Sequence, residues 1–262
     1  MQRRHLLLGA AFLMTVASST ASADILKEEI APTGKLRVAI AISPAGGAFW
    51  STQNSEGIFA GVPVTLGTAM ARELGVSVEF VVHQNSGQIT DAASKGTWDV
   101  AFLPQDTERS SKMAFGPIYE IADATYIVRP GSTVKNFTEL DSDGTKVAAV
   151  SNTTTMRGAL AHLTHARVTG YQTYDEIFEL LKSGSIDAFA LSRDQLNAMA
   201  KRIPGTRVLD ETFKQTTTAV AVPLGHAQAL AFVTRFMETA RADGTLRKAY
   251  DANGLAGALL RG

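Results

Sequence analysis

The sequence contains no cysteine, which excludes a disulfide framework and a lipid-bearing cysteine at a cleavage site. Its stability must therefore come from core burial. Neither sign of charge is in excess, because 25 Lys and Arg residues stand against 25 Asp and Glu residues without any block of like charge. This balance argues against nucleic acid or an anionic membrane surface as a partner.

Long hydrophobic runs are confined to the N-terminus. Arg3 and Arg4 precede an apolar run at 6–16, and small residues at 21–23 precede Asp24. This is the layout of a secretory signal peptide, and the run is shorter than the about 20 apolar residues that span a membrane. We therefore predict a cleavable signal peptide at 1–23 and a soluble periplasmic protein without membrane insertion. The arginine pair leaves both the general secretory and the twin-arginine export routes open.

After residue 23, the chain is long enough for one large domain or two medium ones. Runs that predict strands alternate there with amphipathic stretches that predict helices. The first set predicts strands at 36–42, 76–82 and 100–103, and helices at 62–74 and 86–94. Within this set, Gly75 is a candidate helix C-cap, Ser86 is a candidate N-cap, and Pro104 is expected to stop a strand.

A second set of the same kind begins at residue 146. It predicts strands at 146–150, 166–171 and 187–192, and helices at 153–163, 174–184, 193–203 and 227–243. Extended segments near 118–128 and 214–222 join the two sets. The pattern predicts an α/β fold made of two α/β lobes with a cleft between them.

Polar residues follow several predicted strands directly. Arg109 comes soon after the strand at 100–103, Thr153 to Thr155 follow 146–150, and Ser192 ends the strand at 187–192. Most arginines are simply exposed to solvent. In open α/β sheets, however, ligands bind outside the carboxyl ends of the strands, and this shared position favours an anion-binding role for Arg109.

Four segments of the chain resemble a known family. They are ELGVSVEFV, WDVAF…TERSSKMAFGPIY, SGSIDAFALS and the C-terminal ETARADGTLRKAY. Together they are similar to the periplasmic solute-binding proteins of polar amino acid ABC importers, solute-binding protein family 3. The resemblance runs over nearly the whole chain after residue 23.

The resemblance implies a two-lobed periplasmic binding protein-like fold, with two α/β lobes on a double-strand hinge closing over one small solute. It places lobe 1 at 24–118 and 222–262, lobe 2 at 123–216, and the hinge crossings at 119–122 and 217–221. It also implies a monomer that delivers its solute to the membrane permease of an ABC importer. No cofactor, metal ion or catalytic residue is expected.

The family's carboxylate clamp falls on residues of this chain. Arg109 matches the arginine that grips the ligand carboxylate, and a guanidinium fork suits two carboxylate oxygens. Thr153, Thr154 and Thr155 match the second contact, at the start of a lobe 2 helix, where hydroxyls and free N–H groups form an anion seat. The same threonines are also explained as a helix N-cap.

Other family positions differ here. Ser192 occupies the position where amino acid binders of the family have an acidic residue that pairs with the ligand ammonium. Ala41 replaces another polar residue that contacts the ligand in the family, and Asn85 replaces an aromatic residue that faces the ligand. The sequence therefore predicts a carboxylate-bearing solute without a free α-ammonium, because an unpaired buried ammonium costs several kcal/mol. Phe49 and Trp50 are candidates to stack on the solute, or equally anchors of their loop.

Two rival functions remain open at this stage. Cyclohexadienyl dehydratases resemble the same family, but they need a general acid in the cleft. In this sequence the histidines are scattered, and Glu176 and Asp194 are interpreted as parts of charged first helical turns. Neither group forms an evident catalytic site. A ligand-presenting partner of a membrane sensor would need the same closed lobes as an importer subunit, so the sequence does not separate these two roles.

Overall fold

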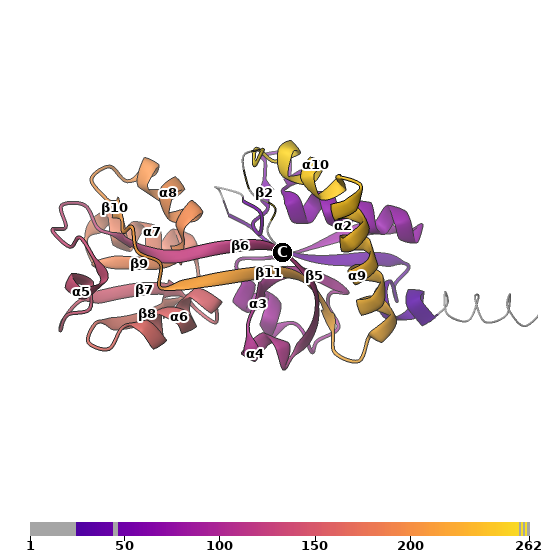
Figure 1. The fold of residues 1–262 in the computed structure, drawn as a ribbon, viewed down its shortest axis with the longest axis horizontal. Helices are drawn as coiled ribbons and strands as arrows, with labels where there is room; N and C mark the ends of the chain where they lie inside the picture. The colour runs from indigo at the N-terminus through magenta and orange to yellow at the C-terminus, as the bar shows by residue number, and fades with distance from the viewer. Residues whose placement is uncertain (1–24, 44–46, 257, 259, 261–262) are drawn as a thin grey trace, which may run out of the picture.

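A computed structural model describes residues 25–43, 47–256, 258 and 260 of the chain, so the predicted signal peptide at 1–23 lies outside the described residues. Figure 1 shows two lobes joined by two long strands. These strands are β6 (Met113–Val128) and β11 (Lys214–Pro223), which pair antiparallel with each other. The two-lobed α/β fold expected from the sequence is confirmed.

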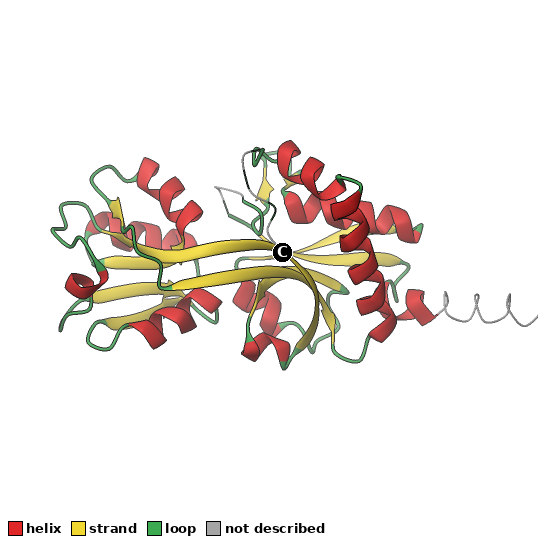
Figure 2. Cartoon of the chain, viewed as in Figure 1, coloured by secondary structure: helices red, strands yellow, loops and turns green. Residues whose placement is uncertain are grey.

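Lobe 1 is built around parallel strands with helices on both faces (Figure 2). It contains one end of β6 and of β11, together with β1 (Lys35–Ala41), β2 (Thr52–Gln53), β3 (Phe59–Ala60), β4 (Ser77–His83), β5 (Val100–Gln105), α2 (Val62–Leu74), α3 (Ser86–Asp91), α4 (Thr107–Ser110), α9 (Ala227–Ala242) and α10 (Thr245–Ala252).

Lobe 2 repeats this plan on the other ends of β6 and β11. It contains β7 (Lys146–Val150), β8 (Arg167–Tyr171), β9 (Ala188–Ser192), β10 (Arg207–Val208), α5 (Phe137–Leu140), α6 (Thr154–His162), α7 (Tyr174–Ser183) and α8 (Arg193–Arg202).

One sheet runs through both lobes in the order β4-β1-β5-β11-β6-β9-β7-β8, and β10 pairs with β6. β1 is parallel to β4 and β5, and β7 is parallel to β8 and β9. The ligand crevice expected at the carboxyl ends of such strands therefore lies where the lobes face each other.

Each lobe buries apolar side chains on both faces of its sheet. In β1, Leu36, Val38 and Ile40 pack into one core with α2, α9 and α10, while the alternate Ala39 and Ala41 face a second core around Trp98. This two-residue alternation is the pleat of a strand buried on both sides. The small alanines let α3 lie close to the sheet, near the cavity described below.

Some local details differ from the sequence-based predictions. Helix α2 ends before Gly75, which is left-handed at φ 69°, as predicted. Ser86 is not the N-cap of α3, because Asn85 holds that place and its side chain accepts from the N–H of Gln88. Pro104 does not stop β5 either. At that point β5 pairs only with β11, so the missing N–H of proline costs no bond to β1.

A buried ion pair fixes β5 beside β1. Asp99 is 2% exposed and accepts hydrogen bonds from the backbone N–H, Nε and Nη2 of Arg37 at 2.8, 3.1 and 2.6 Å. Because β5 leads into α4 and Arg109, this pair helps to position the site.

Replacing Asp99 with Ala is expected to lower the free energy of unfolding by about 2–4 kcal/mol, because it leaves the Arg37 donors without their acceptor. Urea denaturation measures the loss. The control is Glu79→Ala, which removes an exposed pair with Lys35 and should cost less than about 1 kcal/mol. Equal losses in the two variants would contradict this role for Asp99.

Candidate functional site

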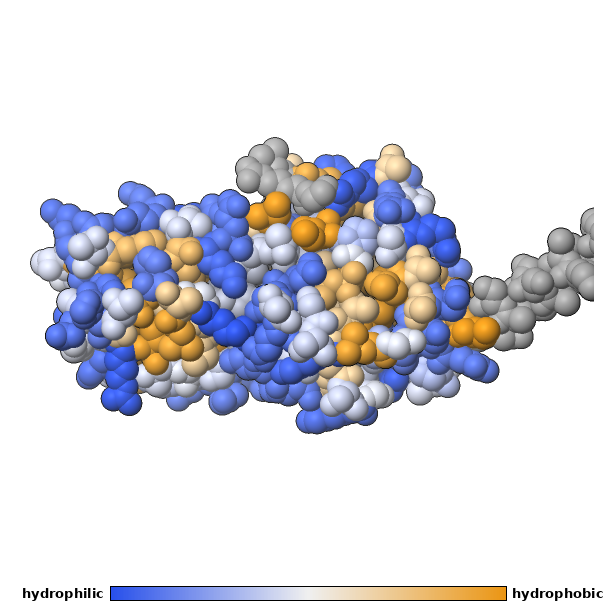
Figure 3. All heavy atoms as spheres, turned by 60° about the horizontal axis from the view of Figure 1, so that its bottom comes forward, coloured by the Kyte–Doolittle hydropathy of each residue, from blue (hydrophilic) through white to orange (hydrophobic). Residues whose placement is uncertain are grey.

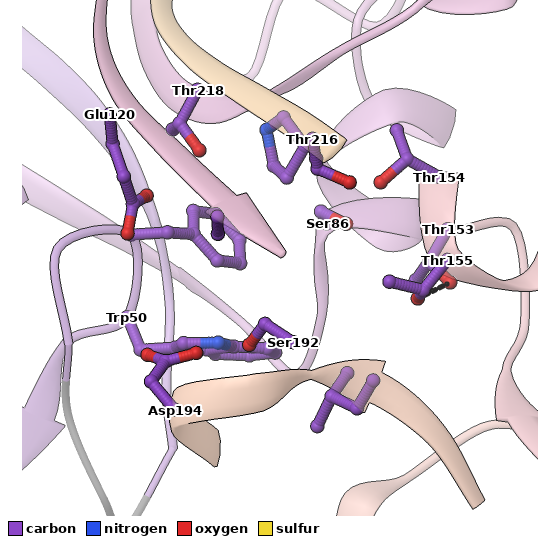
Figure 4. Close-up of a pocket in the computed structure, with 14 residues that line it drawn as sticks. Trp50, Ser86, Glu120, Thr153, Thr154, Thr155, Ser192, Asp194, Thr216 and Thr218 are labelled. Atoms are coloured by element: carbon purple, nitrogen blue, oxygen red, sulfur yellow. Dashed lines mark hydrogen bonds between the residues drawn. The ribbon is translucent and has the colours of Figure 1, made fainter. Parts of the chain in front are cut away.

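A cavity lies between the lobes and is lined by residues from both (Figure 4). About 500 Å³ inside it is free of atoms, counting part of its open mouth. The described lining residues are Phe49, Trp50, Ser86, Pro104, Glu120, Ala122, Thr153, Thr154, Thr155, Leu191, Ser192, Asp194, Thr216 and Thr218.

Most of this wall comes from the places where strands end. Ser86 begins α3 just after β4, Ser192 is the last residue of β9, and Thr153 to Thr155 follow β7 at the start of α6. Six of the residues predicted from sequence line the cavity: Phe49, Trp50, Thr153, Thr154, Thr155 and Ser192. Their roles towards a solute stay a prediction.

The threonine cluster both caps α6 and faces the cavity. The hydroxyl of Thr153 accepts from the N–H of Met156 at 3.1 Å, donates to the carbonyl oxygen of Val150 at 2.7 Å, and lies 2.9 Å from the hydroxyl of Thr155. All three threonines are at least nine-tenths buried. They present hydroxyls beside a helix N-terminus, which favours negative charge.

Arg109 lies behind this wall and is not among the described residues that line the cavity. It is 0% exposed, so its reading as a surface side chain is wrong. Nη1 donates to the carbonyl oxygen of Pro104 at 2.7 Å, and Nη2 donates to Ser86 Oγ at 2.8 Å and to the carbonyl oxygen of Asn152 at 3.1 Å. Asp106 caps α4 and accepts from the backbone N–H of Arg109, which holds the side chain inward.

Two of the five N–H donors of Arg109 stay available, because Nε has no partner among the described residues and Nη1 uses one of its two hydrogens. Burial, aided by the charge of Arg157, lowers the pKa of Arg109 to about 9. The guanidinium is still protonated at neutral pH. It therefore makes this end of the cavity favourable for an anion.

Asn85 also lies outside the described wall of the cavity. Besides capping α3, it donates from Nδ2 to the carbonyl oxygen of Gln172 in lobe 2 at 2.8 Å. Asn85 thus joins the lobes in this structure, and a direct contact of Asn85 with a solute stays a prediction.

Phe49 and Trp50 are both loop anchors and part of the wall. Each is 7% exposed and packs in the core around Trp98, and their ring centroids lie 4.7 Å apart at an interplanar angle of 59°. Their packing agrees with the interpretation as loop anchors, while stacking on a solute stays a prediction.

Two acidic residues of the wall were missed as site residues by the sequence analysis. Glu120 lies on β6, and Asp194, interpreted as part of a charged first turn, lies in the first turn of α8. Burial and the nearby charge of Asp194 raise the pKa of Glu120 to about 7, while a hydrogen bond with Thr218 opposes the shift. The sequence analysis compared Ser192, Ala41 and Asn85 with family positions and did not consider β6 or the first turn of α8.

The two crossing strands supply further lining residues in register. Glu120 is opposite Thr218, and Ala122 is opposite Thr216, so all four share one face of the β6–β11 ribbon. Tyr119, which precedes Glu120, is buried in the core of lobe 1. The alternation of Tyr119, Glu120, Ile121 and Ala122 is the signal that could have identified Glu120 from the sequence.

Polar contacts join the lobes around the cavity. Arg157 on α6 pairs with Asp106 and Glu108 of lobe 1, and Ser43 Oγ donates to Gln195 Oε1 at 2.8 Å. Asn152 Nδ2 donates to Asp91 Oδ1 at 2.7 Å, while Asn152 itself adopts a left-handed φ of 56°. On the face seen in Figure 3, hydrophilic residues cover the junction of the lobes. The structure is therefore a closed arrangement.

Gly87 lies close to the loop before α6 of lobe 2. A Cβ atom on this residue would lie 2.6 Å from the carbonyl oxygen of Ser151, 2.9 Å from Cβ of Asn152 and 2.9 Å from Oδ1 of Asn85 in its own lobe. Glycine therefore lets the start of α3 meet this loop, and most of the crowding comes from lobe 2.

Metal binding and membrane insertion find no support in the described ranges. Within 25–43 and 47–256, no three His, Asp or Glu side chains form a group that could hold a metal ion. None of the helices described there is long and apolar enough to cross a membrane.

Comparisons with known proteins agree with this architecture. The family model of bacterial extracellular solute-binding proteins, family 3, matches residues 38–254. The ABC transporter glutamine-binding protein of Bacillus subtilis is 26% identical over 151 residues, which are 58% of this chain and 55% of that protein. The chain thus spans about half the length, or less, of the curated relatives that it matches.

Two solved structures share the fold. An ancestral amino acid-binding protein, a precursor of cyclohexadienyl dehydratase, is 28% identical with a TM-score of 0.73, covering 86% of this chain and 97% of its own. The solute receptor for L-cysteine of Neisseria gonorrhoeae has a TM-score of 0.77 at 21% identity, covering 88% and 92%. With the match of the family model over most of its length, the chain belongs to the bacterial extracellular solute-binding proteins of family 3.

Proposed function

We propose that this solute-binding protein captures a small carboxylate-bearing solute, amino-acid-like or another organic acid, between its closing lobes. The observation that carries the proposal is the anion-favouring end of the cavity, where the α6 N-terminus and its threonines meet the buried Arg109. A carboxylate there would accept hydrogen bonds from hydroxyls and N–H groups in a site shielded from water. Charge-assisted bonds of this kind are stronger than neutral ones.

In this proposal, Arg109 provides a positive charge that is buried next to the cavity and is separated from it by the residues that line it. Ser86 lines the cavity and accepts from Nη2, so its hydroxyl passes the polarity of the guanidinium on to the solute. The guanidinium supplies the positive potential that the neutral threonines lack.

The protein works in the periplasm in this proposal, after export by the signal peptide at 1–23, as the monomeric partner of an ABC importer permease. The names of its relatives support this role, since the Bacillus subtilis relative is an ABC transporter glutamine-binding protein. The matched family and the curated relatives are named as binding proteins, not as enzymes, and this separates the chain from the dehydratase alternative.

The hinge is proposed at 119–122 and 217–221, between lobe 1 at 24–118 and 222–262 and lobe 2 at 123–216. Both crossings fall inside long paired strands, and the pairing of β11 with β6 is irregular between Thr218 and Ala221. Bending at such a point changes the angle between the lobes while leaving both cores packed.

Native mass spectrometry of the freshly purified protein tests the solute class. The retained solute is expected to carry a carboxylate, and Arg109→Lys should weaken its binding at least about tenfold, because an ammonium lacks the guanidinium fork. Calorimetry measures the change. Arg129→Lys, at an exposed salt bridge with Asp187, is the matched control and should bind normally. A retained solute without any acidic group would contradict the proposal.

Gly87→Ala tests closure separately from folding. The added methyl group meets Ser151 only when the lobes are closed, and such overpacking costs about 1–3 kcal/mol, so the solute should bind about 5- to 100-fold more weakly. Because the methyl group would also lie 2.9 Å from Oδ1 of Asn85 in lobe 1, urea unfolding of the solute-free variant is the control. The loss of affinity should exceed any loss of stability measured in that way.

Small-angle scattering provides the direct readout of closure. Wild type is expected to contract when the solute is added, and Gly87→Ala to contract less. The control is Gly116→Ala within lobe 1, where the nearest atom would be 3.4 Å away. Equal contraction of the Gly87 variant and wild type would show that the lobes do not need this approach.

A further inference from the structure

The side chain of Arg157 leaves its own lobe and reaches the helix that carries Arg109. Arg157 lies on α6 of lobe 2, and Arg109 lies on α4 of lobe 1 (Figure 1). Arg157 Nε donates to Asp106 Oδ2 at 2.8 Å, Nη2 contacts the same oxygen, and Nη1 lies 2.9 Å from Glu108 Oε2. These contacts cross the junction of the lobes, and the proposed function does not use them.

Each of the two acids divides its oxygens between the lobes. Asp106 Oδ1 accepts from the backbone N–H of Arg109 at 3.0 Å, while Oδ2 faces Arg157. Glu108 Oε1 accepts from Lys112 Nζ at 2.9 Å, while Oε2 faces Arg157. The bonds to Oδ1 and Oε1 lie within lobe 1 and do not depend on closure. The other two oxygens gain Arg157 as a partner only when the lobes meet.

Arg157 also acts on the far end of the Arg109 side chain. Its Nη1 donates to Oδ1 of Asn152 at 3.2 Å. Asn152 has a left-handed φ of 56°, and its carbonyl oxygen accepts from Nη2 of Arg109 at 3.1 Å. With its amide oxygen occupied, Asn152 donates from Nδ2 to Asp91 Oδ1 at 2.7 Å. Arg157 therefore contacts both the acid that holds the backbone of Arg109 and the residue that holds its guanidinium.

The contacts of Arg157 are too accessible to water to hold the lobes together by themselves. The side chains of Arg157, Asp106 and Glu108 are 27%, 13% and 39% exposed, and all three line a groove on the surface. Ion pairs at such positions contribute little to stability and are screened by salt. Their contribution is geometric, because a planar guanidinium fork fixes the direction of each partner.

We infer that Arg157 is a positioning residue for solute binding, which fixes α4 and the loop before α6 when the lobes close and so sets the place of the Arg109 guanidinium. This inference rests on the proposed function, in which Arg109 supplies the positive charge for a carboxylate. Arg157 is not among the described residues that line the cavity, so it acts through Arg109 and not on the solute.

A double-mutant cycle measured by calorimetry tests whether Arg157 acts through Arg109. The probe is the carboxylate that native mass spectrometry finds in the purified protein or, if none is retained, the tightest binder among L-glutamine, L-lactate and succinate. Arg157→Ala is expected to weaken binding about fivefold or more, because the closed state loses two ion pairs. Arg109→Lys, which should cost at least about tenfold alone, should then cost about threefold or less, because a guanidinium that is no longer held gains little from its fork.

Asp106→Asn separates the ion pair from the helix cap. Asparagine caps helices as well as aspartate does, so its amide oxygen still accepts from the N–H of Arg109. It lacks the charge that pairs with Arg157, and it should weaken binding about as much as Arg157→Ala, with no further loss in the double variant. Arg157→Lys should restore the affinity only in part, because an ammonium cannot contact Asp106, Glu108 and Asn152 with one planar fork.

Lys112→Ala is the matched control. It removes the other cation from Glu108, but within lobe 1, so the affinity should stay within about twofold of wild type. Salt gives a readout that a purely structural role would not move. The affinity of wild type should fall about threefold or more between about 20 and about 500 mM NaCl, and that of Arg157→Ala should fall less, because partly exposed pairs are screened and the buried Arg109 is not.

The outcomes separate this inference from the proposed function. If the losses of Arg109→Lys and Arg157→Ala multiply in the double variant, Arg157 does not act through Arg109, and the inference is overturned while the proposed function stands. Unchanged affinity in Arg157→Ala, or an equal loss in Lys112→Ala, leads to the same conclusion. A wild-type protein that retains a solute without an acidic group, or that binds no carboxylate, would overturn the proposed function and this inference with it.

Discussion

The guanidinium of Arg109 is charged, fully buried and hydrogen-bonded only to neutral atoms within the described structure. Acids such as Asp106 and Glu108 stabilise the charge of the Arg109 guanidinium only through longer-range electrostatic attraction. Its three bonds tie together the end of β5, the start of α3 and the loop before α6. Burying a charge without an ion pair costs stability. In this fold the buried charge creates an anion-favouring centre at the junction of the lobes.

The described contacts that join the lobes near that charge are polar. Asn152 receives a hydrogen bond from Arg109 and gives one to Asp91, while Arg157 reaches Asp106 with its side chain 27% exposed. Partly exposed pairs of this kind contribute little net stability, since water replaces them readily. In the proposed function, contacts of this kind leave the balance between open and closed lobes to be shifted by the solute.

The sequence predicted the architecture well because that information is periodic and local. The two sets of strands and helices, the Gly75 cap and the threonine cap of α6 all follow from spacing and residue type. Burial of Arg109 and the place of Glu120 could not be predicted in this way, because both depend on packing between distant segments. Pro104 shows the same limit, since its effect on β5 depends on which neighbouring strand needs its N–H.

Each end of the cavity is completed by both lobes. At the anion-favouring end, Ser86 and Arg109 of lobe 1 meet the threonines of lobe 2, and at the acidic end Trp50 and Glu120 meet Asp194. The wall of the cavity is thus complete only when the lobes are together. In the proposed function, a carboxylate-bearing solute meets groups of both lobes at the anion-favouring end. Selection among solutes and closure of the lobes are then one physical event, because a ligand shifts the balance between two states only by as much as it prefers one of them.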